Sequence, residues 1–182
     1  MDTQFFRRWF SRPEKPAAQT AEALADGGDA EAQFRLGMKF AREGAGQDYA
    51  QAARWYLKAA DQKHAPAQFK PASMYAAGQG VTRDDAQSMG WMQKAADLGD
   101  AGAQYHIGMK HHRASLDGKP ENASESRIQA YKWLQLASAQ GYRTSQGAWA
   151  SVAMTMTHED VADATRRVAA FIPARVNPLP GH

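Results

Sequence analysis

The spacing of apolar residues in the first third of the chain predicts two amphipathic helices joined by a turn. Ala32, Leu36 and Phe40 recur every four residues, so they lie on one face of a helix. A glycine-rich stretch, GAGQDYAQA, then interrupts the pattern and predicts a turn. Trp55 and Ala59 share one face of the helix that follows. A single helix pair cannot bury its apolar faces alone, so we expect neighbouring pairs to stack on it.

The same pattern recurs along the chain, which indicates a helical repeat protein. One column is a glutamine, found at Gln33, Gln68, Gln104 and Gln146. A second is a tryptophan followed four and five residues later by small residues, found at Trp55, Trp91 and Trp133. A third is aromatic or nearly so, found at Phe40, Tyr75 and His111. We expect the tryptophans to be largely buried between repeats.

Turns and helix ends are also visible in the sequence. Asp48 and Asp84 hold equal positions in the first two turns and are expected to cap the following helix. Gly99 and Gly141 supply helix stops. The glutamine steps are 35, 36 and 42 residues, so the third unit is six residues longer. We expect the extra stretch, between His112 and Arg127, to be an exposed mobile loop.

The C-terminal part predicts one more helix. Thr157 and Asp160 form a capping-box-like pair, and Pro173 ends the apolar stripe that follows. The predicted organisation is a lead segment at 1–16, a repeat region at 17–156, a capping helix at 157–173 and a loose tail at 174–182. Within the repeat region the units lie near 28–63, 64–99 and 100–141, with a half unit at 142–156. The sequence therefore predicts an all-α solenoid of αα-hairpins with about 3.5 repeats.

Composition agrees with this architecture. The chain is rich in alanine, the best helix former, and poor in Val and Ile, which disfavours a β-sheet core. The absence of cysteine excludes disulfides, thiolate metal sites and a cysteine nucleophile. A formal net charge of +3 is too small to indicate nucleic-acid binding. No apolar run approaches the length of a membrane span, and no signal peptide is recognised, so a cytoplasmic location is expected.

The columns resemble the Sel1-like repeat, a relative of the tetratricopeptide repeat. The front half of the pattern is carried by AEAQFRLG at 30–37 and the latter half by YAAGQGVTRDDAQSMGWMQKAADLG at 75–99. The repeat positions are Leu36, Gly37, Phe40, Trp55, Tyr75, Trp91, Gly108 and Trp133. Departures are Lys63 for the closing glycine, His111 for a tyrosine, and Pro71, which should disturb its helix by removing a backbone donor. The resemblance implies a right-handed superhelix and an adaptor that binds a protein or peptide.

A recurring set on the first helix of each unit is a candidate binding surface. It comprises Phe34, Met38, Phe69, Tyr105 and Met109. On a helical wheel these side chains lie away from the core residues, so they could line a groove for a peptide. The alternative is that they are half-buried packing positions that recur because the repeat recurs.

A basic column flanks that set. It comprises Arg35, Lys70 and His106, with Arg42 and Arg113 near the helix ends. Cations in this arrangement favour acidic side chains or a carboxylate on the partner. The alternative is an ordinary solvated face.

Catalytic and metal chemistry find little support in the sequence. His106, His111 and His112 lack a suitable helical spacing and a completing carboxylate, so packing or loop roles are favoured over a metal site. Asp84 and Asp85 are adjacent and point in different directions, which suits capping better than acid–base catalysis. We therefore expect no enzymatic activity, no cofactor and no bound metal.

The segment FFRRWF at 5–10 supports a second functional hypothesis. It clusters Phe5, Phe6, Trp9 and Phe10 with Arg7 and Arg8. Such a segment could anchor an adaptor at a membrane surface. The alternatives are a segment that covers the open end of the first repeat, or a disordered lead. The sequence leaves the partner and the oligomeric state open.

Overall fold

The computed structural model describes residues 20–42, 47–117 and 122–171, and within these ranges the chain is helical with no strand. This confirms the all-α helical-repeat fold. The helices are α2 (Ala21–Asp26), α3 (Ala30–Ala41), α4 (Tyr49–Asp61), α5 (Ala65–Ala77), α6 (Asp85–Leu98), α7 (Ala101–Leu116), α8 (Ala123–Ala139), α9 (Arg143–Ala153) and α10 (His158–Phe171).

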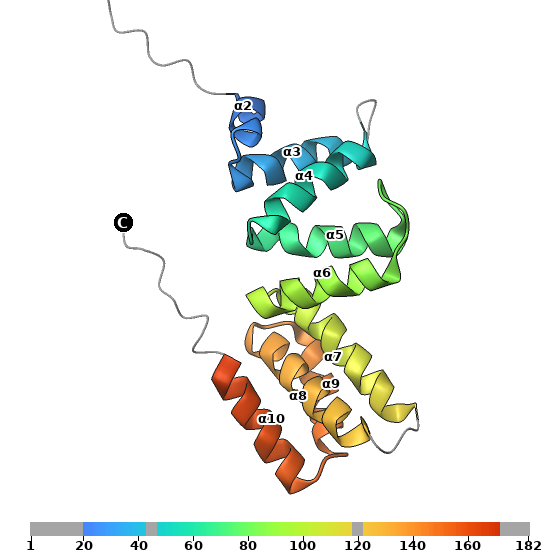
Figure 1. Cartoon of the computed structure of the whole chain (residues 1–182). Coiled ribbons are helices and arrows are strands. Elements are labelled where there is room, and N and C mark those ends of the chain that lie inside the picture. The colour runs from blue at the N-terminus through green and yellow to red at the C-terminus, as the bar shows by residue number, and fades with distance from the viewer. Residues whose placement is uncertain (1–19, 43–46, 118–121, 172–182) are drawn as a thin grey trace, which may run out of the picture.

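Successive helices pack on one another, as a solenoid requires. The hairpins α3/α4, α5/α6 and α7/α8 follow one another along the stack (Figure 1). The C-terminal end is less regular, because α9 and α10 both pack against α8. α2 packs against α3 and covers the other end of the described stack.

Aspartates begin four of these helices, namely α3, α4, α6 and α7. Asp48 Oδ1 accepts a hydrogen bond from the Gln51 amide at 3.0 Å, and Asp84 Oδ1 accepts from the Gln87 amide at 2.9 Å, so both predicted caps are confirmed. Asp29 and Asp100 cap α3 and α7 in the same way. Each carboxylate satisfies amides that the first helical turn leaves without a partner.

The predicted capping box and helix stops are also present. The Asp160 amide donates to Thr157 Oγ1 at 3.2 Å, and the Thr157 amide donates to Asp160 Oδ2 at 3.4 Å. Gly99 adopts a φ of 102° and Gly141 a φ of 80°, the left-handed conformation that ends a helix. Lys63, which replaces the corresponding glycine, adopts a φ of 61°.

A buried glutamine fastens each of the first three repeats to the helix before it. The side-chain amides of Gln33, Gln68 and Gln104 donate to the carbonyls of Ala25, Ala60 and Ala96 at 3.0, 3.0 and 3.1 Å. Gln146 stands at the equivalent position, the fourth residue of α9, but its side chain is exposed, and the preceding Ser145 is the buried residue. The first helices α3, α5 and α7 each form a hairpin with the helix that follows, whereas α10, the helix after α9, packs against α8.

The tryptophan column is buried in two of three places. Trp91 and Trp133 are 7% and 3% exposed. Trp55 is only half-buried, against the expectation, because α2 is short and offers it only a small apolar cluster with Ala25 and Leu36. A lysine ammonium lies over each ring, at 4.1 Å from the ring centroid for Lys58, 3.8 Å for Lys94 and 4.3 Å for Lys132.

Glycines allow the two helices of a hairpin to approach closely. A Cβ on Gly37 would lie 2.7 Å from the ring of Tyr56, and one on Gly108 would lie 2.7 Å from Leu134 Cγ. Leu36 is buried beside Gly37, whereas Phe40 and Tyr75, which share the aromatic column, are half-buried.

Two expectations about irregularity are wrong. α5 runs continuously from Ala65 to Ala77 with Pro71 fully buried inside it, so the proline does not interrupt the helix. The described parts of the insertion in the third unit are largely helical, because α7 extends to Leu116 and α8 begins at Ala123, while residues 118–121 lie outside the described residues. The extra residues lengthen both helices, where their added turns can keep their backbone hydrogen bonds.

Candidate protein-binding surface

An open pocket of about 470 Å³ lies over the second half of α3. Its lining, which we call the α3 cradle, comprises Arg35, Met38, Lys39, Ala41 and Arg42 of α3 and Tyr56 of α4. Met38 is 40% exposed, an unusual solvent contact for a large apolar side chain. Methionine is flexible and polarisable, so it adapts to varied apolar partners.

A second pocket, of about 480 Å³, lies over α7. Its lining, the α7 cradle, comprises Met89 and Met92 of α6 with His106, Met109, Lys110, Arg113, Ala114 and Asp117 of α7. Met89, Met92 and Met109 are half-buried, and His106, Lys110 and Arg113 are exposed. An apolar floor with cations at its edge is therefore present here too.

The two cradles are built by the same repeat positions. Arg35, Met38, Lys39 and Arg42 stand 71 residues before His106, Met109, Lys110 and Arg113. The segments GMKFAR and GMKHHR carry three of these four positions as a shared Gly-Met-Lys-x-x-Arg motif. The middle repeat lacks the motif. Its α5 offers Lys70 on the surface but places a buried Met74 where the motif lysine would stand.

The charges of the two cradles differ. In the α3 cradle, Arg35 Nε lies 2.6 Å from Glu31 Oε1, and Lys39 Nζ lies 2.7 Å from Glu22 Oε1. Hydrogen bonds from Arg35 and then from His64 lower the pKa of Glu31, which keeps this carboxylate ionised.

In the α7 cradle, Lys110 and Arg113 form no ion pair with another described residue, although the acidic Asp117 lines the same pocket. Burial lowers the pKa of the neighbouring His111, and the charge of Lys110 lowers it further, so His111 tends to stay neutral. Lys110 and Arg113 are thus unpaired among the described residues, whereas Arg35 and Lys39 of the α3 cradle are paired with carboxylates.

The aromatic residues of the predicted surface lie outside both cradles. Phe34, Phe69 and Tyr105 are half-buried and make ring contacts. The centroid of Phe34 lies 5.2 Å from that of His64, Phe69 lies 6.2 Å from His106, and Tyr105 lies 5.1 Å from Tyr142. Each ring thus contacts a residue of the next repeat, so these aromatics bring consecutive repeats together.

Comparison with known proteins identifies the repeat. A model of the Sel1 repeat matches residues 30–64, 65–100 and 101–142, more than half of the chain. The chain belongs to the Sel1 repeat family. No curated protein matches the chain in a search by sequence. Sel1 repeats generally mediate protein interactions, and such scaffolds are typically non-catalytic.

Solved structures share the fold. A Sel1 repeat protein from Oxalobacter formigenes is 31% identical, with a TM-score of 0.58, and the match covers 72% of this chain and 95% of that one. A protective antigen of uropathogenic Escherichia coli strains, described as having an SLR fold, is 25% identical with a TM-score of 0.65. That match covers 89% of this chain but only 35% of the antigen, so the chain spans about a third of that relative.

The remaining candidate residues of this Sel1 repeat chain are dispersed. His106 is exposed beside Phe69, His111 is half-buried, and His112 Nδ1 is buried without a hydrogen-bond partner among the described residues. Within those residues no group of three or more His, Asp or Glu side chains is placed to hold a metal ion. Asp84 caps α6, and its neighbour Asp85 pairs with Arg83 on the surface.

The N-terminal FFRRWF segment and the tail at 174–182 lie outside the described residues. Among the helices that the structure describes, none is long and apolar enough to cross a membrane.

Sequence reasoning missed part of the cradles, namely Lys39, Lys110, Met89 and Met92. The repeated Gly-Met-Lys-x-x-Arg motif was a usable signal for the two lysines, because it recurs at one repeat position. Met89 and Met92 carried no such signal, since α6 contributes them through tertiary packing against α7.

Proposed function

We propose that this Sel1 repeat protein is a non-catalytic scaffold that binds an acidic, partly apolar segment of a partner protein along the first helices of its repeats. The observation that carries the proposal is the recurrence of one cradle, with matching methionine and cations and nearly equal volume, on α3 and α7. A methionine floor accepts apolar side chains, and the flanking cations attract carboxylates.

The half-buried aromatics would act as anchors between the cradles. Phe69 and Tyr105 keep part of their rings accessible while their other edges contact the next repeat. Aromatic and arginine side chains supply most of the affinity in typical interfaces. Lys70 is exposed on the intervening α5 and would extend the basic border between the two cradles.

The experiment begins with acidic peptides selected from a random displayed library on the wild-type protein, followed by anisotropy titrations of the selected peptides. Reversing Lys110 and Arg113 to Glu should weaken binding at least tenfold and reduce its salt dependence, because cations that steer association are lost. Replacing Phe69 or Tyr105 by Ala should cost about 2 kcal/mol of binding free energy if they are anchors.

The matched control is Arg54→Glu, which reverses an exposed charge on α4 outside both cradles. Thermal unfolding of each variant separates lost binding from lost folding. Full affinity in the folded Lys110→Glu, Arg113→Glu double variant, or an equal loss in the Arg54→Glu control, would show that the cradles are not the binding site.

A further inference from the structure

Two of the three buried repeat glutamines have both ends of their amide satisfied. Gln33 Oε1 accepts a hydrogen bond from Gln62 Nε2 at 2.8 Å. Gln104 Oε1 accepts from Gln140 Nε2, also at 2.8 Å. Gln62 and Gln140 directly follow α4 and α8, the second helices of the first and third repeats. In these two repeats, the residue after the second helix therefore donates a hydrogen bond to the glutamine of the first helix.

The middle repeat breaks this arrangement. Gln62 and Gln140 each lie seven residues after a repeat tryptophan, Trp55 or Trp133. The residue seven positions after Trp91 is Leu98, which has no side-chain donor. Gln68 is 3% exposed, and its Nε2 donates to the Ala60 carbonyl. Its Oε1 is buried and has no hydrogen-bond partner among the described residues. A buried acceptor without a donor is rare in proteins and calls for an explanation.

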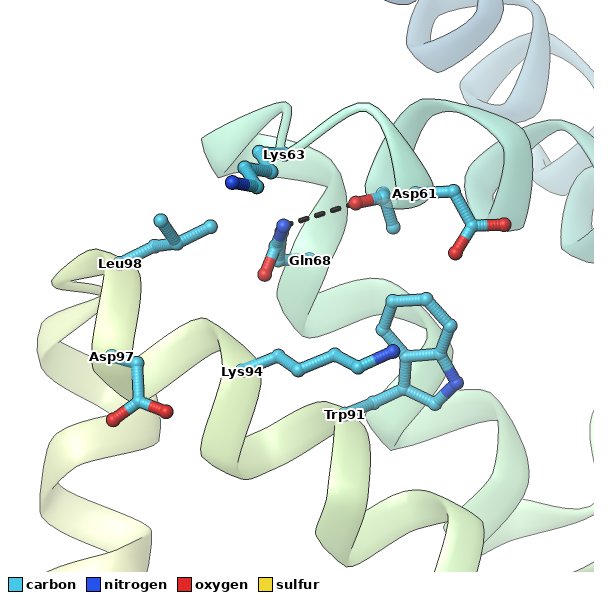
Figure 2. Close-up of a pocket in the computed structure, with 8 residues that line it drawn as sticks. Asp61, Lys63, Gln68, Trp91, Lys94, Asp97 and Leu98 are labelled. Atoms are coloured by element: carbon cyan, nitrogen blue, oxygen red, sulfur yellow. Dashed lines mark hydrogen bonds between the residues drawn. The ribbon is translucent and has the colours of Figure 1, made fainter.

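A pocket of about 350 Å³ lies directly against Gln68. It is lined by Ala60, Asp61, Lys63, Gln68, Trp91, Lys94, Asp97 and Leu98. Figure 2 shows the Gln68 amide oxygen turned toward the space between Leu98 and Lys94, while the amide nitrogen faces the opposite way. The volume is far larger than the roughly 30 Å³ that one water molecule occupies in the liquid.

The lining selects the chemistry of an occupant. Gln68 Oε1 needs a donor, and a carboxylate has none at neutral pH. The lining contains two cations, Lys63 and Lys94, and two carboxylates, Asp61 and Asp97. Its formal net charge is therefore zero and does not favour a charged occupant. A carboxamide carries a donor and an acceptor side by side, so it could donate to Gln68 Oε1 and accept from a lysine ammonium.

We propose that this pocket binds the side-chain carboxamide of a glutamine or asparagine from a partner polypeptide. The incoming amide supplies the donor that Gln62 and Gln140 supply in the flanking repeats. It reaches the buried Gln68 Oε1 when the exposed side chains of Leu98 and Lys94 move aside. Trp91 and Leu98 contact the methylene groups of the incoming side chain. The site lies apart from both cradles, since it shares no lining residue with them, and it recognises a neutral group.

The direct test is a titration of the ¹⁵N-labelled full chain, followed by NMR at the Gln68 side-chain amide and the Trp91 indole N–H. The probes are N-acetyl-glutamine methylamide and the corresponding derivatives of Glu, Ser and Leu, which differ only in the side chain. We expect the glutamine probe to shift both signals and to bind at least tenfold more tightly than each of the others. Equal binding by the Glu, Ser or Leu probe, or no shift with the glutamine probe, would overturn the proposal.

A pair of variants tests the mechanism independently of the probes. Leu98→Gln restores the internal donor, so it should abolish binding of the glutamine probe and move the Gln68 amide signals toward those of Gln33 and Gln104. Leu98→Met has similar length without a donor and should retain binding within about twofold. If folded Leu98→Gln binds the probe as well as wild type does, the missing internal donor is not what creates the site.

Discussion

Replacing the buried repeat glutamines one at a time by methionine should give unequal losses of stability. Methionine keeps the length of the side chain but can neither donate nor accept a conventional hydrogen bond. Gln104→Met removes two hydrogen bonds, to the Ala96 carbonyl at 3.1 Å and from Gln140 at 2.8 Å. At about 1 kcal/mol each, the free energy of unfolding should fall by about 2 kcal/mol.

Gln68→Met should cost much less. Among the described residues it removes a single hydrogen bond, to Ala60 at 3.0 Å, and it also removes an acceptor that is buried there without a partner. Burial of such an acceptor costs about 1–3 kcal/mol, so its removal offsets the lost bond. We expect the free energy of unfolding to stay within about 1 kcal/mol of wild type. The two substitutions should therefore differ by about 2 kcal/mol although they are chemically identical.

Urea unfolding followed by far-ultraviolet circular dichroism measures this difference. With a slope of about 2 kcal/mol per molar urea, it corresponds to about 1 M in the midpoint. Gln33→Met is the matched control, because Gln33 also makes two hydrogen bonds and should behave like Gln104. Equal losses at all three positions, with unchanged slopes, would refute the reasoning.

Two further predictions concern packing and pH. Gly108→Ala should lower the free energy of unfolding by about 1–3 kcal/mol, because the added Cβ would meet Leu134. Gly90→Ala adds a Cβ that meets no described residue within 4 Å, so it should raise the free energy of unfolding by about 0.5–1 kcal/mol in the same urea assay. A loss of stability at both positions would contradict the packing argument. Hydrogen bonds from Arg167 and then from Gln129 lower the pKa of Glu125, so their stabilisation is present at neutral pH and is lost as the pH falls below about 4.5. Arg167→Gln should reduce the loss of stability between neutral and acidic pH by a few tenths of a kcal/mol, because the Arg167–Glu125 pair is largely exposed. The prediction fails if the difference between the urea midpoints at the two pH values is the same in the variant and the wild type.

The sequence was informative wherever the physical cause is local. Asp48, Asp84 and the Thr157–Asp160 pair act on amides within three residues, so the residue types alone locate the helix starts. The repeat pattern likewise predicted the hairpins. Apolar residues spaced four apart lie on one face of a helix, and a second helix that packs on that face removes it from water.

The errors arose where the cause lies in a distant part of the chain. The half-burial of Trp55 depends on the shortness of α2. The exposure of Gln146 accompanies the packing of α10 against α8, which leaves α9 without the hairpin partner of the other first helices. The insertion was expected to be a loop because loops accommodate most insertions, but here the added residues extend α7 and α8. The pockets need contacts between helices, which one-dimensional spacing does not contain.

The repeats differ in the number of hydrogen bonds that their buried glutamine makes, and this difference affects how easily the stack bends. The side chains of Gln33 and Gln104 are hydrogen-bonded both to the helix before them and to the residue that follows the second helix of their own repeat. Within the described part of the chain, Gln68 makes only the first of these two hydrogen bonds. The middle repeat has one hydrogen bond fewer at this position, so it should deform more easily than the other repeats of the described stack. The α3 cradle lies before Gln68 and the α7 cradle after it. Bending therefore varies the span between the two cradles, and a carboxamide bound at Gln68 would stiffen the middle repeat and hold that span at one length.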